Sequence, residues 1–152
     1  MEVKNTGFIQ IAIIYLRLAL ATAYLSSVAS RFGLWGEGMG WGNFQNFLAY
    51  TAKLNPFLPP SMIPFVGWTA TIAETLFGIL LIIGFRIKET AFLSGVMLIL
   101  FAIGMTIGFN VKEPLDYSVY TASAASFLLA AFHRSSFSLD AFFNPTAEGK
   151  SL

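Results

Sequence analysis

Two charged residues, Arg17 and Glu74, stand inside long apolar segments of the sequence. Arg17 lies ten residues after Gly7, and Glu74 lies ten residues before Gly84. If the two segments form antiparallel helices with both glycines at one membrane surface, a rise of about 1.5 Å per residue places both charges roughly 15 Å deep. An unpaired charge at that depth costs about 3 kcal/mol on insertion scales. We therefore expect Arg17 and Glu74 to contact each other, directly or through one water or ligand.

This expected pair has two compatible interpretations. A buried salt bridge can serve only to fix the register of two helices. Ionisable side chains within a membrane also mark ligand and proton paths. The second interpretation makes Glu74 a candidate proton carrier, and we identify no other candidate for a catalytic role.

Polar residues recur on one face of the first apolar segment. They are spaced seven apart, close to two helical turns, and they are Gln10, Arg17, Tyr24 and Arg31. The second segment has a face of small and polar residues, which permits close helix approach or leaves room for a ligand: Gly67, Thr71, Glu74 and Gly78. We expect these faces to wall a cavity whose ligand-binding residues are Arg17, Tyr24, Arg31, Thr71 and Glu74. The alternative is a polar seam packed against other helices.

The residue types that are absent limit the chemistry. The sequence has no cysteine, which excludes disulfides, thiolate metal sites and iron–sulfur clusters within one chain. His133 is the only histidine, so a haem or zinc site is not expected. The net charge of +1 suggests no nucleic-acid partner. We expect no metal and no covalently bound cofactor, and any cofactor chemistry would come from a bound molecule such as a quinone or from a partner.

The elements that must position these residues are apolar helices. Only 11% of the 152 residues are charged, whereas a soluble domain carries about 25% charge. A membrane-spanning helix needs roughly 20 residues, and four segments come near this length: 7–30, 61–84, 90–109 and 117–132. The sequence thus predicts an all-α integral membrane protein, a four-helix bundle that forms a single membrane domain over residues 1–152.

The long connection between the first two segments contains a further predicted helix. Residues 43–54 place Phe44, Phe47 and Leu48 on one helical face, and Asn43 is a suitable N-cap. With Trp35 and Trp41 nearby, this amphipathic helix should lie at the membrane interface. It either anchors the chain there or acts as a lid over the cavity, formed by Trp35, Trp41, Phe44 and Phe47.

Basic residues in the connections predict the orientation. One side carries Lys4, Arg86, Lys88, Arg134 and Lys150, and the other carries Arg31, Lys53 and Lys112. The excess favours both termini in the cytoplasm and the long connection outside. We expect a multi-pass protein of the cytoplasmic (inner) membrane, with the lipid bilayer as its surroundings.

Three features together resemble one family. They are Leu16-Arg-Leu18 inside the first helix, Arg31 near its end, and the stretch Glu74-Thr-Leu-Phe-Gly-Ile-Leu-Leu-Ile-Ile-Gly-Phe85 followed by a basic turn. Over roughly residues 11–132, the sequence resembles the DoxX family of small prokaryotic membrane proteins. The resemblance implies a four-helix bundle in the cytoplasmic membrane. Relatives in that family include a subunit of a thiosulfate:quinone oxidoreductase and membrane partners of sulfur-handling or oxidative-stress enzymes.

Three functions remain open at this point. The first is a membrane subunit that binds a quinone or another apolar ligand for a partner oxidoreductase, and that is not catalytic alone. The second is a non-enzymatic scaffold or assembly partner. The third is a conduit for a small solute or for protons. The sequence does not indicate an oligomeric state.

Overall fold

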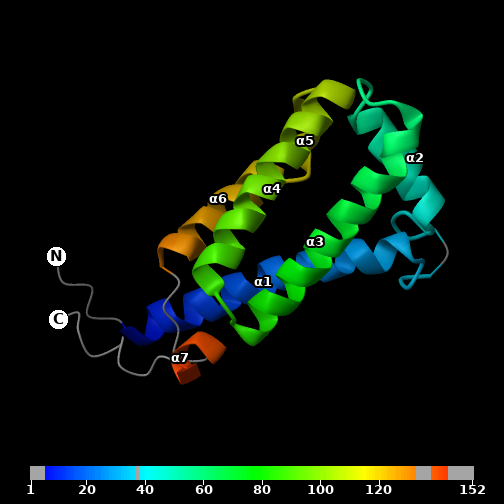
Figure 1. Ribbon diagram of the computed structural model, residues 1–152. Coiled ribbons are helices and arrows are strands. Elements are labelled where there is room, and N and C mark those ends of the chain that lie inside the picture. The colour runs from blue at the N-terminus through cyan, green and yellow to red at the C-terminus, as the bar shows by residue number, and fades with distance from the viewer. Residues whose placement is uncertain (1–5, 37, 133–137, 144–152) are drawn as a thin grey trace.

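The computed structural model describes residues 6–36, 38–132 and 138–143, and within these ranges the chain is helical, without strands. The helices are α1 (Thr6–Arg31), α2 (Phe44–Leu54), a 3-10 turn (Pro60–Met62), α3 (Ile63–Ile83), α4 (Ile87–Gly108), α5 (Lys112–Asp116), α6 (Val119–Ala131) and α7 (Leu139–Phe143) (Figure 1). The all-α prediction is confirmed. We call the end of the molecule with the α3–α4 connection the turn end, and the end with α2 and α5 the loop end.

Three of the helical segments are long and apolar enough to cross a membrane: Gly7–Arg31, Pro60–Ile83 and Ile87–Gly108. These agree with three of the predicted spans to within a few residues. The fourth segment forms α6, which is apolar but has only 13 residues, fewer than the roughly 20 that a span requires. The structure therefore shows a protein with three candidate transmembrane helices.

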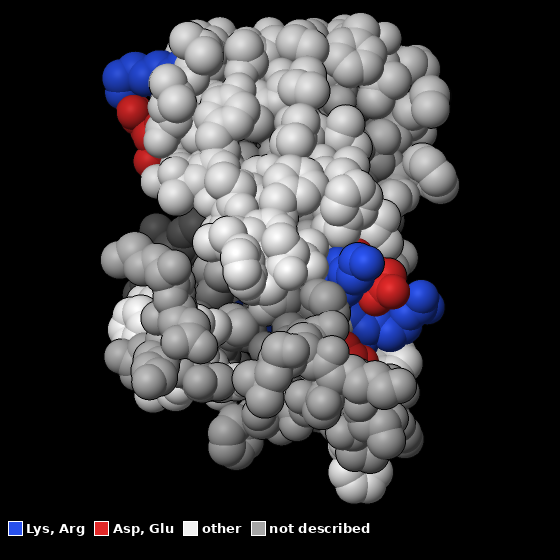
Figure 2. All heavy atoms as spheres, turned by 90° about the vertical axis from the view of Figure 1, so that its left-hand side faces the viewer, with Lys and Arg blue, Asp and Glu red and all other residues white. Residues whose placement is uncertain are grey.

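The surface agrees with membrane insertion. The outward face of α3 is lined by exposed apolar side chains, among them Phe65, Ile72 and Leu76. Figure 2 shows the charged side chains of one face gathered in two groups, with an uncharged surface between them. Exposed charges lie at the α3–α4 turn and in α5, at opposite ends of the apolar helices. This separation is the pattern that a bilayer imposes on a protein that crosses it.

Small residues let the helices approach in pairs. In α3, a Cβ added at Gly78 would lie 2.7 Å from the side chain of Leu25 in α1. In α4, a Cβ at Gly95 would lie 3.0 Å from the ring of Phe127 in α6. The missing side chains thus give the facing helix the space that its large residue fills. The pairs α1–α3 and α4–α6 make up most of the packed interior.

Helix α2 forms where the sequence predicts an amphipathic helix. The Asn43 side chain caps it by accepting from Asn46 N at 2.9 Å. Phe47 and Thr51 are buried, and the far end of α2 rests on α4, where Gly108 admits the backbone of Lys53 and Leu54. Helix α2 therefore packs against the small residues of α4 near Gly108.

The turn end is closed by α7. Gly84 and Arg86 both have positive φ, +70° and +48°, so the chain reverses sharply between α3 and α4. The carboxylate of Asp140 accepts from Arg86 N at 2.7 Å and from Ile87 N at 2.8 Å. Asp140 N in turn donates to Gly84 O at 3.1 Å. A residue of α7 therefore caps the first turn of α4.

The connection between α4 and α6 contains α5. Asp116, the last residue of α5, pairs with Lys112, and α6 begins without a side-chain cap. Lys4, Arg134 and Lys150, which carry part of the orientation argument, lie outside the described residues, as does His133.

Candidate functional site

Arg17 and Glu74 do not pair, and that sequence prediction is wrong. Arg17 Nε donates to Leu81 O at 3.0 Å, and Arg17 Nη2 donates to Ile82 O at 3.1 Å. The Glu74 carboxylate instead pairs with Arg31, whose Nη2 lies 2.7 Å from Glu74 Oε2.

The error lies in the assumed register of the two helices. Arg17 is level with Leu81 and Ile82, seven to eight residues beyond Glu74 along α3, a displacement of roughly 11 Å along a helix. Helix α1 therefore starts beyond the α3–α4 turn instead of level with it (Figure 1). The first glycine of one helix and the last glycine of the other do not mark the same depth.

The site forms around the guanidinium of Arg31, at the last residue of α1. Its Nη2 donates to both carboxylate oxygens of Glu74 at 2.7 Å, and its Nη1 donates to Thr71 Oγ1 at 2.8 Å. Ser27, one turn earlier on α1, accepts from Nη2 at 3.2 Å. Arg31 is 3% exposed and Glu74 2%. Two charges so deeply buried must be paired, because desolvation penalises each of them alone.

Aromatic side chains of α2 and its neighbours pack on one side of this pair. The Phe47 ring of α2 lies 3.9 Å from Arg31 Cζ, measured to the ring centroid, a cation–π distance. The Trp41 ring contacts Phe47 at 5.8 Å and Tyr50 at 4.5 Å between centroids. Phe44 packs on Trp68 of α3 at 4.5 Å. These contacts hold α2 over the Arg31–Glu74 pair.

Trp35, the fourth residue expected in the lid, is placed differently. Its side chain is exposed, and its Nε1 donates to Ser26 O at 3.2 Å. It therefore borders the loop end and does not cover the pair.

Two buried polar atoms of the site have no hydrogen-bond partner among the described residues: Tyr24 Oη and Arg31 Nε. The Tyr24 hydroxyl faces Ser94 of α4 and Ser126 of α6. Each serine hydroxyl donates to a carbonyl of its own helix, at 3.0 Å and 2.9 Å, but its oxygen could also accept from Tyr24. An unsatisfied buried donor costs about 1–3 kcal/mol, so of the two atoms Arg31 Nε has the clearer need for an acceptor.

The structure thus brings four of the five expected ligand-binding residues to one region: Tyr24, Arg31, Thr71 and Glu74. All four are buried, as the two predicted helix faces require. Arg17 is buried too, but it belongs to the turn end, where it binds the last carbonyls of α3.

Sequence reasoning missed three serines of this region. Ser27 lies four residues before Arg31, the spacing that puts two side chains on one helical face. This spacing could have identified Ser27 as a neighbour of Arg31 from the sequence alone. Ser94 lies on α4 and Ser126 on α6, and only the tertiary structure brings them to Tyr24.

The site offers no set of metal ligands. Among the described residues, no group of three or more His, Cys, Asp or Glu side chains is placed to hold a metal ion. The chemistry available is hydrogen bonding from buried donors and a single paired carboxylate.

Comparison with known proteins adds no relative. No protein-family model, no curated protein and no solved structure matches this chain. A function for the site is therefore argued from its own geometry.

Proposed function

We propose that this chain is a DoxX-like membrane subunit that binds a quinone, or another apolar ligand with acceptor oxygens, for a partner oxidoreductase. The observation that carries the proposal is that two buried donors, Arg31 Nε and Tyr24 Oη, make no hydrogen bond within the part of the chain that the structure describes. A quinone carbonyl only accepts hydrogen bonds, so it complements both atoms. Its apolar tail suits the apolar helices that surround the site.

The resemblance to the DoxX family supports the same function. Two of the three features that carry it, Arg31 and the stretch beginning at Glu74, meet in the buried ion pair. The third, Arg17, holds the other end of the same two helices together. The residues that carry the resemblance therefore connect α1 to α3, at the interface where the ligand would bind.

Glu74 is the candidate proton carrier of this proposal. Quinone reduction consumes electrons and protons, and a carboxylate beside the ligand could supply a proton. The chain has no cysteine and one histidine, so the electrons would come from the partner. Arg31 would then hold Glu74 in place and stabilise its charged form.

The finer architecture is part of the proposal. We infer a four-helix arrangement in the inner membrane, in which α6 completes the bundle through its packing on α4, supported by Ser123 Oγ donating to Gly95 O at 2.9 Å. Helix α2 would lie at the outer interface. Because Arg31 is buried in an ion pair, it no longer counts as a loop charge, which increases the positive bias of the turn end. Both termini would be cytoplasmic.

One observation favours a second function, a non-enzymatic membrane scaffold or assembly partner. Arg31 occupies both carboxylate oxygens of Glu74, and the pair is closed over by Phe47. A pair so enclosed can serve to fix the register of α1 and α3 without any ligand.

A titration of the purified protein with a short-chain quinone separates the two functions. Tyr24→Phe removes the buried hydroxyl, and Tyr15→Phe removes an exposed one from the same helix, where Tyr15 is 74% exposed. We expect wild type and Tyr15→Phe to bind alike, and Tyr24→Phe to bind about tenfold more weakly, the effect of one lost hydrogen bond. No binding to wild type, or equal binding to all three, would leave the scaffold as the better account.

A further inference from the structure

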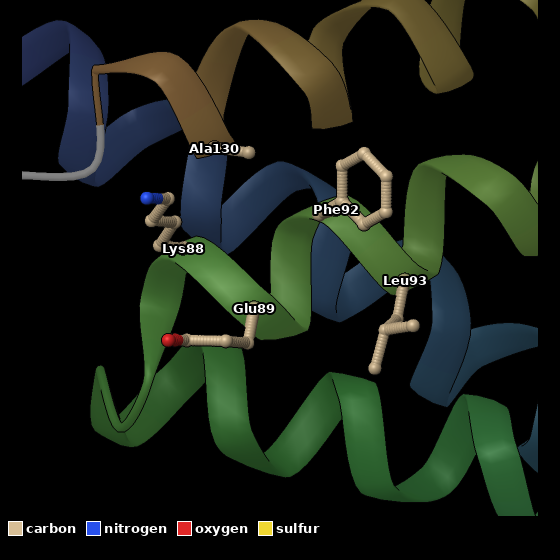
Figure 3. Close-up of a pocket in the computed structure, with 5 residues that line it drawn as sticks. All are labelled: Lys88, Glu89, Phe92, Leu93 and Ala130. Atoms are coloured by element: carbon tan, nitrogen blue, oxygen red, sulfur yellow. The ribbon is translucent and has the colours of Figure 1, made fainter.

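A groove lies between α4 and α6 at the turn end, away from the site described above. Its volume is about 290 Å³, and it is lined by Lys88, Glu89, Phe92, Leu93 and Ala130. Figure 3 shows Lys88 and Glu89 directed toward the end of α4, with Phe92 and Leu93 further along the helix. The groove is thus lined by apolar atoms alone, and the charged ends of Lys88 and Glu89 extend beyond it, at what we call its mouth.

The spacing of these residues matches the boundary of a membrane. Lys88 is the second residue of α4, and Phe92 and Leu93 follow four and five residues later, about 6–8 Å deeper along the helix. No charged residue follows Glu89 in α4. The mouth would therefore lie among lipid headgroups while the walls contact acyl chains.

The charges at the mouth leave one cation available. Glu89 pairs with Arg86 at 3.8 Å between Oε1 and Nη2. Lys88 has no ion-pair partner among the described residues, and its side chain is exposed. A zwitterionic headgroup would bring a second cation to the mouth, where both nearby carboxylates are engaged: Glu89 with the Arg86 side chain, and Asp140 with the backbone amides of Arg86 and Ile87. A headgroup with a net negative charge brings no additional cation, and its phosphate can pair with Lys88.

We infer that this groove binds an anionic phospholipid of the phosphatidylglycerol class. Lys88 Nζ contacts the lipid phosphate, and one acyl chain lies along Phe92 and Leu93 against Ala130. This inference does not depend on the proposed quinone site, which lies deeper between α1 and α3.

Native mass spectrometry of the detergent-purified protein tests the inference. The protein is mixed with phosphatidylglycerol or phosphatidylcholine of identical acyl chains, and the retained lipid is compared. We expect wild type to retain phosphatidylglycerol preferentially. Lys88→Gln should lower that retention about fivefold, the effect of one basic residue at the membrane surface, whereas Lys53→Gln at the loop end should not.

A second pair of variants tests the apolar wall. Leu93 and Leu100 are both exposed and lie two turns apart on α4. Leu93→Gln should lower retention of phosphatidylglycerol, and Leu100→Gln should leave it unchanged. Equal retention of the two lipids by wild type would overturn the inference. So would an effect of Lys53→Gln as large as that of Lys88→Gln, or loss of retention in neither leucine variant or in both.

Discussion

Arg31 Nη2 lies 2.7 Å from both carboxylate oxygens of Glu74, a residue 43 positions later in the chain. Both side chains are buried, so this one contact joins the end of α1 to the middle of α3. The first prediction follows from it. Arg31→Ala and Glu74→Ala should each destabilise the protein by about 3–5 kcal/mol, because each strands the other charge. Unfolding of the detergent-solubilised protein measures this.

The double variant Arg31→Met/Glu74→Leu provides the control for that prediction. It removes both charges and replaces them with apolar side chains, so it should recover much of the lost stability. If either single variant unfolds like wild type, the pair is not buried as described.

Arg17 should be energetically independent of Glu74. Arg17→Met removes hydrogen bonds to Leu81 O and Ile82 O and should cost about 1.5–3 kcal/mol, the range for bonds to a charged group. In a double-mutant cycle, the coupling between Arg17 and Glu74 should be within about 0.5 kcal/mol of zero. A coupling as large as that between Arg31 and Glu74 would mean that the two helices have the register first expected from the sequence.

The Asp140 cap on α4 should matter more than a surface ion pair. Asp140→Ala leaves Arg86 N and Ile87 N without their acceptor and should destabilise by about 1–2 kcal/mol. Asp116→Ala breaks an exposed pair with Lys112 and should cost less than Asp140→Ala, because solvent screens exposed ion pairs. Thermal unfolding of both variants compares them, and equal losses would contradict the capping role.

The α1–α3 contact should depend on Gly78. A Cβ there would meet Leu25 at 2.7 Å, so Gly78→Ala must push α1 away and should cost about 1–3 kcal/mol. Gly7→Ala is the matched change on α1, where a Cβ would meet nothing within 4 Å. It should be neutral or slightly stabilising, since alanine favours helix. A Gly78→Ala protein as stable as wild type would show that the helices have room to spare.

Alkaline pH should weaken the loop end through Tyr50. Burial raises the pKa of Tyr50 above its ordinary value of 10, and the nearby Glu113 and Tyr117 raise it further. The folded state therefore holds this proton more tightly than the unfolded state, so stability is full below about pH 10 and falls as the pH rises past that value. In Tyr50→Phe, unfolding temperatures measured from pH 9 upward should fall less steeply. Parallel curves for the two proteins would refute this.

Local patterns predicted more of this structure than long-range placement. The seven-residue spacing predicted one shared face for Gln10, Arg17, Tyr24 and Arg31, because a helix fixes which residues share a face. The last three are buried and Gln10 is partly buried. Asn43 correctly marked the start of α2, because an N-cap bonds only to its own helix.

The partner of Glu74 could not be predicted in the same way. Both Arg17 and Arg31 lie on the correct face of α1, and choosing between them requires the axial offset of α1 against α3. That offset is set by packing such as Leu25 on Gly78, which the polar residues alone do not reveal. The candidate site was therefore assigned to the right helices and faces, with the wrong arginine as the partner of Glu74.

The cap on α4 has a consequence for how the chain is made. Asp140 lies 53 and 54 positions after the two backbone amides that it binds, so a ribosome releases the α3–α4 hairpin well before it releases the cap. Until then, those two amides lack the acceptor that they have in the folded protein. The reversal at Gly84 and Arg86 is therefore capped only after α6 and α7 have been synthesised, so an early turn depends on a helix that is made after all three long apolar helices.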